Sequence, residues 1–207
     1  MKAKPRVIVV GAGPAGLAAA DALCGMGFHV TVIDEGFQSG GQYLKRPAPE
    51  FLRPATGDFL YSFGLSLVDR ISASGAAFLA EAQVVGAEEG GRLWVETREG
   101  RLTEMKGDAI VLATGARERF SPFNGWTLPG VVSTGAIQLL VKTSGVLPAR
   151  SMAVAGCGPL PASVAAEVST AGGRVSLLLD QTPLLNHGRF FLGLAAHPAK
   201  LLDACKK

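Results

Sequence analysis

The chain opens with a succession of apolar and small residues that predicts strand, turn, helix and strand in that order. A run rich in valine and isoleucine, Arg6 to Val10, is followed by glycines and by an alanine-rich stretch that ends near Gly25 to Gly27. A second β-branched run, Val30 to Ile33, ends in two acidic residues. Both runs are almost continuously apolar, as is typical of central strands in a parallel sheet that is covered on both faces. The pattern therefore predicts an N-terminal βαβ unit.

The middle of the chain predicts one helix followed by short strands. Apolar residues recur at helical spacing from Asp58 to Ser74, which indicates a helix. Three strand candidates separated by glycine-containing turns come next, at Ala77 to Ala87, Arg92 to Thr97 and Arg101 to Met105. We interpret them as a small antiparallel meander. The meander leads into a further apolar strand at Asp108 to Ala113.

The opening pattern returns late in the chain, where a strand, a glycine turn, a helix and a strand begin at Ser151. The segments VIVVGAGPAG and MAVAGCGPLP align with Gly11 opposite Gly156, an offset of 145 residues (156 − 11 = 145). We interpret this as an internal repeat. The predicted fold class is α/β, with two Rossmann-like lobes. A three-layer lobe with a parallel sheet and the meander spans residues 1–120, and the start of a second lobe spans residues 121–207.

Composition argues against several classes of function. Of the 207 residues 48% are hydrophobic. The net charge is +3, and the charged residues form no block of one sign, so nucleic acid is not an expected partner. No uninterrupted apolar stretch reaches about 18 residues, so no membrane span is expected. The cysteines, Cys24, Cys157 and Cys205, are too far apart for a redox pair, a zinc cluster or a disulfide framework. The histidines show no metal-ligand spacing either, and we expect a cytoplasmic protein without a metal.

The first glycine turn, GAGPAG, has the spacing of a dinucleotide-binding fingerprint. Gly11 permits a tight turn, Gly13 lets the backbone approach a pyrophosphate, and Gly16 lets the helix lie close to the sheet. The helix N-terminus offers N–H groups to the diphosphate, and a proline suits the first helical turn because no donor is needed there. The residues predicted to bind the diphosphate are Gly11, Gly13, Pro14, Ala15 and Gly16.

An acidic residue at the end of the second strand completes the fingerprint. Asp34 is the predicted acceptor for hydrogen bonds from both ribose hydroxyls, and Glu35 takes this role if the register shifts by one residue. The fingerprint by itself does not distinguish FAD from NAD, because both cofactors contain the same ADP half.

Three later segments resemble the flavoproteins with two dinucleotide-binding domains, the glutathione reductase structural class. They are GGQ at Gly40 to Gln42, DAIVLATGARER at Asp108 to Arg119, and the strand segment Gln83 to Val85. In that class the first loop follows the FAD diphosphate and ribityl chain, the ATG strand end passes close to the cofactor, and the third segment offers backbone groups to the adenine. The resemblance implies FAD as cofactor. The binding residues that it implies are Gly41, Gln42, Val84, Ala113, Thr114 and Gly115.

Within this superfamily, the chain is most similar to the group that contains the A subunits of opine oxidases, the B subunits of hydrogen cyanide synthases and the α subunits of amino-acid dehydrogenases. The likeness is carried by VIDEGFQSGGQ, by LATGARERFSPFNGWTLPGVVSTGAIQLLVKTSG and by DQTPLL. It implies an FAD-dependent oxidoreductase polypeptide that oxidises an amino acid or an opine, in a hetero-oligomer with a second flavoprotein subunit. In that group a later segment returns to complete the first lobe. We therefore expect an N-terminal fragment that is inactive alone and retains FAD weakly or not at all.

The second glycine turn, GCGPLP, departs from the fingerprint because Pro161 stands in place of the third glycine. The second candidate nucleotide site consists of Gly156, Gly158 and Asp180, and its ligand, NAD or another nucleotide, stays open. Two alternative functions also stay open: an NAD(P)H-dependent flavin reductase and a noncatalytic nucleotide-binding subunit. No residue is assigned as a catalytic acid or base, since a flavin carries the redox chemistry itself.

Overall fold

The computed structural model describes residues 4–44 and 59–195. The chain divides into two compact units, residues 1–117 and 118–207. None of the helices in the two described ranges is long and apolar enough to cross a membrane. The nucleotide-binding roles given to the two predicted domains stay predictions.

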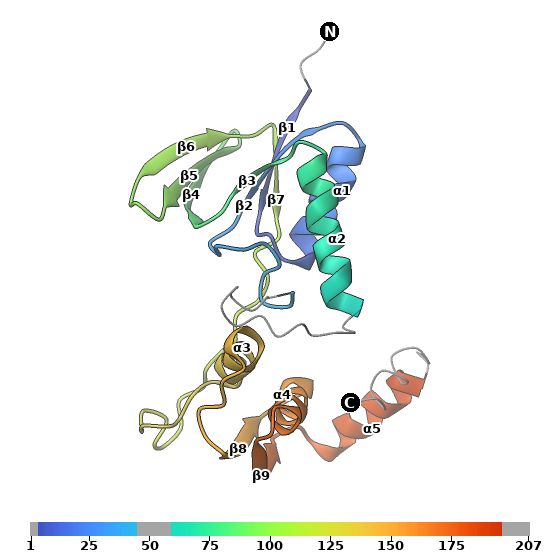
Figure 1. The fold of residues 1–207 in the computed structure, drawn as a ribbon, viewed down its shortest axis with the longest axis vertical. Coiled ribbons are helices and arrows are strands. Elements are labelled where there is room, and N and C mark those ends of the chain that lie inside the picture. The colour runs from blue at the N-terminus through green and yellow to red at the C-terminus, as the bar shows by residue number, and fades with distance from the viewer. Residues whose placement is uncertain (1–3, 45–58, 196–207) are drawn as a thin grey trace. The chain divides into compact units, whose positions relative to one another are not determined.

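Unit 1 is built on a parallel sheet of four strands in the order β3-β2-β1-β7 (Figure 1). The strands are β1 (Arg6–Val10), β2 (His29–Ile33), β3 (Ala77–Leu79) and β7 (Ala109–Leu112). β1 lies in the middle of the sheet and pairs with both β2 and β7. The parallel sheet and the two central apolar strands that the sequence predicts are confirmed.

Helices cover one face of this sheet. The helices are α1 (Pro14–Gly25) and α2 (Phe59–Ala73), which lie side by side in Figure 1. Successive side chains of a strand point to opposite faces of the sheet, and one set of β1 and β2 side chains packs against the two helices. The buried residues of this layer are Val9, Ala12, Leu17, Ala20, Val30, Val32, Leu44, Leu67 and Ile71.

An antiparallel meander covers the other face. Its strands are β4 (Ala82–Glu88), β5 (Arg92–Thr97) and β6 (Leu102–Lys106), in the order β4-β5-β6. The remaining side chains of β1 and β2 meet the meander. The buried residues here are Ile8, Val10, Ile33, Ala82, Leu93 and Val95. Unit 1 therefore has helices, a parallel sheet and a meander as its three layers, which confirms the predicted architecture.

One strand prediction needs correction, because the single strand predicted at Ala77 to Ala87 is two strands in two different sheets. β3 is an edge strand of the parallel sheet, and β4, the first strand of the meander, begins three residues after β3 ends. The break falls at Glu81, whose φ of +53° lies in the left-handed region that L side chains rarely adopt. The sequence has neither glycine nor proline at this break, so no turn signal was available.

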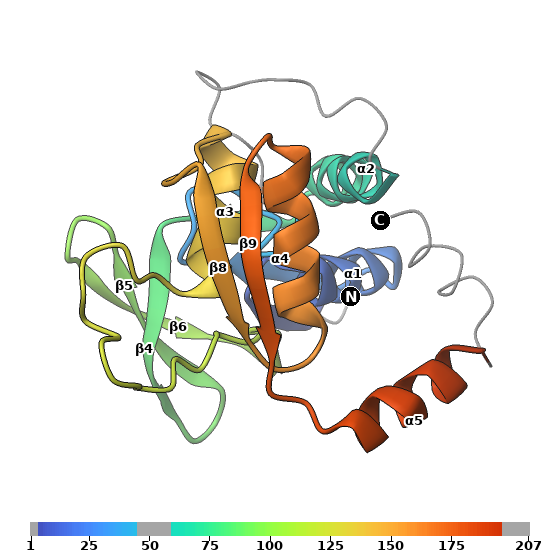
Figure 2. The same ribbon diagram turned by 90° about the horizontal axis from the view of Figure 1, so that it is seen from below.

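Unit 2 repeats the strand-helix-strand arrangement on a smaller scale (Figure 2). The parallel strands β8 (Ser151–Gly156) and β9 (Arg174–Asp180) are joined through α4 (Pro159–Thr170), and α3 (Thr134–Ser144) packs on α4. A further helix, α5 (Leu184–Ala195), follows β9. The small core of unit 2 consists of Ile137, Val164 and Val168, with Val141, Leu147, Met152 and Val175 packed against them.

Candidate functional site: the glycine turn and the ends of β1, β2 and β4

The first glycine turn leaves no room for side chains at two of its three glycines. A Cβ at Gly11, where φ is +104°, would lie 2.3 Å from the backbone oxygen of Ala113. A Cβ at Gly16 would lie 1.8 Å from the backbone oxygen of Gly11. Both distances are far below van der Waals contact, so α1 reaches the ends of β1 and β7 only because these positions are glycine.

The middle glycine of the turn differs from the other two. Gly13 has ordinary extended dihedrals, φ −74° and ψ −179°, and a Cβ there would meet nothing closer than the Cα of Gly41, at 3.9 Å. The space in front of Gly13 is therefore open. Gly13 is also the N-cap of α1, and no side chain of the described residues caps this helix end. The first-turn N–H groups of α1, which lack partners within the helix, remain available to an anion.

The GGQ loop lies directly over this turn. The N–H of Gly40 donates to the backbone oxygen of Ala12 at 2.7 Å. A Cβ on Gly41 would lie 2.8 Å from the Cα of Gly13, and φ at Gly41 is +58°. Gln42 follows with an exposed side chain. The glycine turn and the GGQ loop, both predicted to bind the cofactor, thus lie together. Because glycines face each other there, no side chain covers the backbone of either loop.

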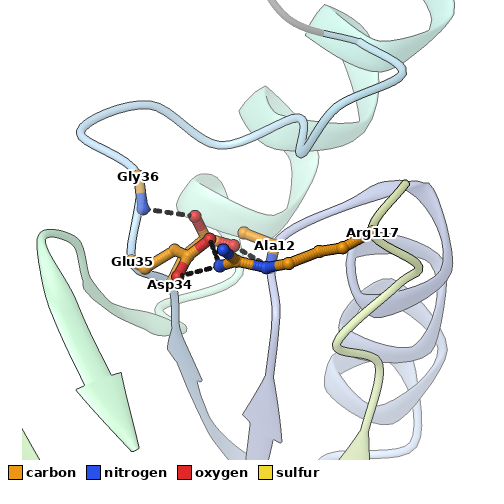
Figure 3. Close-up of polar contacts among 5 residues, drawn as sticks. All are labelled: Ala12, Asp34, Glu35, Gly36 and Arg117. Carbon is orange, nitrogen blue, oxygen red and sulfur yellow. Dashed lines mark hydrogen bonds and ion pairs between the residues drawn. The ribbon is translucent and has the colours of Figure 1, made fainter. Parts of the chain in front are cut away.

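Asp34 binds the glycine turn to the end of β2. Its Oδ2 accepts a hydrogen bond from the N–H of Ala12 at 2.5 Å, and its Oδ1 accepts one from the N–H of Gly36 at 2.8 Å (Figure 3). Ala12 is fully buried, so its N–H needs an acceptor within the protein. Both carboxylate oxygens of Asp34 are therefore engaged in holding the backbone.

Glu35 is exposed and pairs with a side chain instead of with backbone. Its two carboxylate oxygens accept hydrogen bonds from Nη2 of Arg117, at 2.5 and 2.7 Å (Figure 3). The Glu35 side chain is 54% exposed and that of Arg117 77%, so this ion pair contributes little stability. The two adjacent acids therefore differ, because Asp34 is bound to backbone while Glu35 is open to a ligand.

We expect Asp34→Ala to destabilise unit 1 by about 2–3 kcal/mol, since a hydrogen bond to a charged acceptor contributes about 1.5–3 kcal/mol and the N–H of Ala12 is left buried and unpaired. Denaturant unfolding followed by circular dichroism measures the change. The matched control is Glu35→Ala, which removes an exposed acid from the neighbouring position and is expected to change stability by less than about 1 kcal/mol. Equal losses from the two variants would contradict the division of roles.

An open cleft adjoins Glu35. Its volume of about 370 Å³ is within the range of small-molecule sites, about 300–1,000 Å³. Three segments meet there: the end of β2, the start of β4 and the end of β5. The lining residues are Glu35, Glu81, Ala82, Gln83, Glu96, Thr97 and Arg98. Sequence reasoning missed most of this set, because its members come from segments that only the fold brings together.

The remaining predicted residues of unit 1 lie after the end of β7 and on β4. Ala113 follows β7, and its N–H donates to the backbone oxygen of Val10 at 2.8 Å. Thr114 and Gly115, exposed and with φ of +71° at Gly115, continue the chain toward Arg117. Val84 lies on β4, half-buried, next to the cleft residue Gln83. Their contacts with a cofactor stay predictions.

The second glycine turn has a different geometry. Gly158 has φ +78°, whereas the corresponding Gly13 is extended. Pro161 is buried, and a Cβ on Gly156 would lie 2.8 Å from the Cγ of its ring. The proline thus occupies the contact that the third glycine makes in the first turn. This difference explains how α4 follows β8 without that glycine.

A side chain of unit 2 occupies part of its own glycine turn. The N–H of Gly158 donates to the Thr182 hydroxyl at 3.1 Å. The Asp180 carboxylate accepts hydrogen bonds from the hydroxyl and from the backbone N–H of Thr182. These two hydrogen bonds, the hydroxyl's first, and the nearby His187 hold the pKa of Asp180 below its usual value. Asp180 and Gly158 are therefore joined through Thr182, which sequence reasoning did not identify. The second nucleotide site stays a prediction.

The described part of the chain contains few residues of the types that bind metals or form disulfides close to one another. No group of three or more His, Cys, Asp or Glu that could hold a metal occurs in residues 4–44 and 59–195. In the same ranges Cys24 and Cys157 are free thiols, while Cys205 and His197 lie outside the described residues. The residues present fit a dinucleotide instead, with bare backbone for a diphosphate, an exposed carboxylate for a ribose and an adjoining cleft.

Comparison with known proteins relates this arrangement to a family. A profile of pyridine nucleotide-disulphide oxidoreductases matches residues 5–191. The A subunit of opine oxidase from Rhizobium meliloti (strain 1021) is 40% identical over 176 residues, which cover 84% of this chain and 38% of that protein. The HcnB subunit of hydrogen cyanide synthase from Pseudomonas aeruginosa is 35% identical over 201 residues, which cover 96% of this chain and 43% of that protein. The chain thus spans less than half the length of these curated relatives.

Among solved structures, L-proline dehydrogenase from P. horikoshii has a similar fold. The TM-score is 0.68 at 22% identity, and the match covers 86% of this chain and 36% of that one. At this identity the likeness concerns the fold alone. It agrees with the Rossmann-like α/β class predicted from the sequence.

Proposed function

The chain belongs to the pyridine nucleotide-disulphide oxidoreductase family, a family of FAD-dependent oxidoreductases, and on this premise we propose that unit 1 binds the ADP half of FAD. The observation that carries the proposal is the open backbone at Gly13, with Gly41 directly opposite. A diphosphate in this space would accept hydrogen bonds from the uncapped first turn of α1 and gain from the positive end of the helix dipole. The bound FAD supplies the redox chemistry.

Within this proposal Glu35 binds the ribose hydroxyls, and Asp34 orients the turn. Two observations support the choice: both oxygens of Asp34 accept backbone hydrogen bonds, and the Glu35 carboxylate is exposed at the edge of the cleft. Arg117 then holds the Glu35 carboxylate in place. Gln42, Ala113, Thr114 and Gly115 would follow the rest of the cofactor, as their resemblance to the flavoprotein segments implies.

We further propose that the whole protein oxidises an amino acid or an opine as one component of a hetero-oligomeric, cytoplasmic enzyme. The support is similarity to polypeptides of opine oxidase and of hydrogen cyanide synthase, since the names of both relatives describe subunits. The free thiols of Cys24 and Cys157 agree with a reducing compartment. Use of NADH by unit 2 has weaker support, because the Thr182 hydroxyl already accepts from the N–H of Gly158.

The binding proposal is tested by titrating the purified 207-residue chain with FAD and following flavin fluorescence. We expect saturable binding of one FAD per chain and about tenfold weaker binding for Glu35→Gln, since each tenfold is about 1.4 kcal/mol, a typical contribution of a hydrogen bond to a charged group. The matched control is Glu89→Gln, which changes another exposed glutamate of unit 1. Because this chain is expected to retain FAD weakly, the outcome that would contradict the proposal is a folded full-length protein that binds no FAD.

The redox proposal is tested by adding candidate amino acids and opines to the FAD-loaded protein and watching for loss of visible flavin absorbance. Bleaching supports an oxidoreductase role for this polypeptide. Stable FAD binding without bleaching, in the presence of the partner that oxidises substrate, would favour the noncatalytic nucleotide-binding role. Bleaching by NADH alone would favour the flavin reductase.

A further inference from the structure

The second strand of each βαβ unit ends in the same hydrogen-bonded loop. In unit 1 the Oδ1 atom of Asp34 accepts a hydrogen bond from the N–H of Gly36 at 2.8 Å. In unit 2 the Oδ1 atom of Asp180 accepts one from the N–H of Thr182, also at 2.8 Å. In both units the donor lies two residues after the acid at the strand end. Thr182 therefore holds in unit 2 the position that Gly36 holds in unit 1.

The side chain at this position distinguishes the two glycine turns. Glycine has none, and the space in front of Gly13 in unit 1 is open. The Thr182 hydroxyl instead accepts a hydrogen bond from the N–H of Gly158 at 3.1 Å. Gly158 is the N-cap of α4, as Gly13 is the N-cap of α1. A hydroxyl of the protein itself thus lies at the start of α4.

The first turn of α4 also has fewer hydrogen-bond donors than the first turn of α1. Each helix begins with a proline, Pro14 in α1 and Pro159 in α4, and a proline has no N–H. α4 has a second proline, Pro161, two residues further on. Of the first three residues, two therefore have an N–H in α1 and one has an N–H in α4. Because a diphosphate at a helix start binds such N–H groups, α4 is the weaker site for it.

The Thr182 hydroxyl belongs to a short segment that joins β9 to α5 (Figure 2). We call this segment, residues 180–187, the strap. The hydroxyl donates to the Asp180 carboxylate while it accepts from Gly158, so it acts as donor and acceptor within the protein. Nε2 of His187 lies 3.4 Å from Oδ2 of Asp180. Both carboxylate oxygens of Asp180 thus have partners in the strap, and ribose hydroxyls would have to compete with them.

We propose that the strap is an autoinhibitory contact that closes the second glycine turn to a dinucleotide, with the Thr182 hydroxyl bound where a phosphate oxygen would bind. Pro161 adds to the exclusion, because it lacks the N–H that the third glycine of the fingerprint supplies. Unit 2 then has the fold of a dinucleotide-binding lobe without the binding. NADH has no route to a flavin through unit 2, which weighs against the flavin-reductase alternative. The inference concerns unit 2 alone and does not depend on FAD binding by unit 1.

The test measures NADH binding through the polarisation of nicotinamide fluorescence. The full-length protein carries Gly13→Val throughout, so that the first glycine turn is blocked. With this substitution alone we expect no saturation up to about 1 mM NADH, the range of very weak binding. Adding Thr182→Gly, which copies Gly36 of unit 1, is expected to give saturable binding that is at least about tenfold tighter, the size of one hydrogen bond to a charged group. Adding Pro161→Gly as well should tighten binding further.

Two control variants, each combined with Gly13→Val, leave the strap closed. Thr182→Ser retains the hydroxyl, and Thr170→Gly removes a hydroxyl that donates to the backbone oxygen of Ala166 at the other end of α4. Both are expected to bind NADH no better than Gly13→Val alone. Thermal unfolding shows whether each variant is folded, and Thr182→Ala replaces Thr182→Gly if the glycine variant is unfolded.

Each outcome decides the inference. A Gly13→Val protein that saturates with NADH below about 1 mM overturns it, because the second turn is then open. Folded variants with Thr182→Gly and Pro161→Gly that bind NADH no better than Gly13→Val alone overturn it too. Binding that appears with Thr182→Gly and not with Thr182→Ser supports it. Failure of the proposed function would be seen separately, in the FAD titration of unit 1.

Discussion

A Gly13→Val variant is expected to fold like the wild-type protein and to bind FAD at least about 100-fold more weakly, a loss of about 2.7 kcal/mol. The backbone at Gly13 is extended, and an added Cβ would meet no protein atom closer than 3.9 Å. The fold therefore has room for a Cβ at this position. The ligand is excluded, because the new methyl groups occupy the space through which the diphosphate approaches the backbone.

The measurement is an FAD titration together with thermal unfolding of each variant. Gly25→Val is the matched control, since Gly25 ends the same helix and a Cβ there would meet nothing within 4 Å. It should leave FAD affinity unchanged. If a folded Gly13→Val protein binds FAD normally, the diphosphate does not bind at this turn. That result would contradict the central part of the proposed function.

A Gly16→Val variant is expected to fail at an earlier stage, by unfolding unit 1. The added Cβ would lie 1.8 Å from the backbone oxygen of Gly11 and 3.3 Å from the Cβ of Ala113. Both neighbours belong to the ends of β1 and β7, so relief requires α1 to move away from the sheet. Overpacking in a core typically costs about 1–3 kcal/mol, and a clash with backbone should exceed this and reach about 4–5 kcal/mol or more.

Tryptophan fluorescence can assign the unfolding to unit 1. Trp94 lies in unit 1 and Trp126 in unit 2, so a Trp126→Phe background leaves Trp94 as the reporter. We expect Gly16→Val to show the unfolded emission of Trp94 without denaturant, while Gly25→Val in the same background keeps the folded emission. If the unfolding free energies of Gly16→Val and Gly25→Val lie within about 1 kcal/mol of each other, the close contact of α1 with the sheet is contradicted.

Local sequence patterns were sufficient where one segment contains the whole signal. The apolar strands β1 and β2 and the intervening glycine turn are contiguous, so period and glycine spacing predicted the βαβ unit correctly. The break between β3 and β4 was missed because Glu81, which is left-handed and contacts the distant residues Gly36 and Arg98, gives no turn signal. Local propensity cannot predict a conformation that distant contacts impose.

The site likewise combines features that the local sequence predicts with features that only the fold creates. Asp34 and Glu35 are adjacent in sequence, but they have different partners from elsewhere in the chain: Ala12 for Asp34, and Arg117, 82 residues away, for Glu35. Thr97 and Arg98 lie at a hairpin end that looks like any polar turn in the sequence. Only the meeting of β2, β4 and β5 at one cleft gives these residues shared surroundings.

The central place of β1 in the sheet also affects how unit 1 folds during synthesis. Arg6 pairs with His29, 23 residues later (29 − 6 = 23), whereas Val7 pairs with Ala109, 102 residues later (109 − 7 = 102). A ribosome adds about 5–20 residues per second, so β1, α1 and β2 emerge seconds before β7 does. Through that interval the second edge of a strongly apolar strand has no neighbour and can pair with another chain. A nascent chain stalled in this interval is the form of the protein most in need of a chaperone.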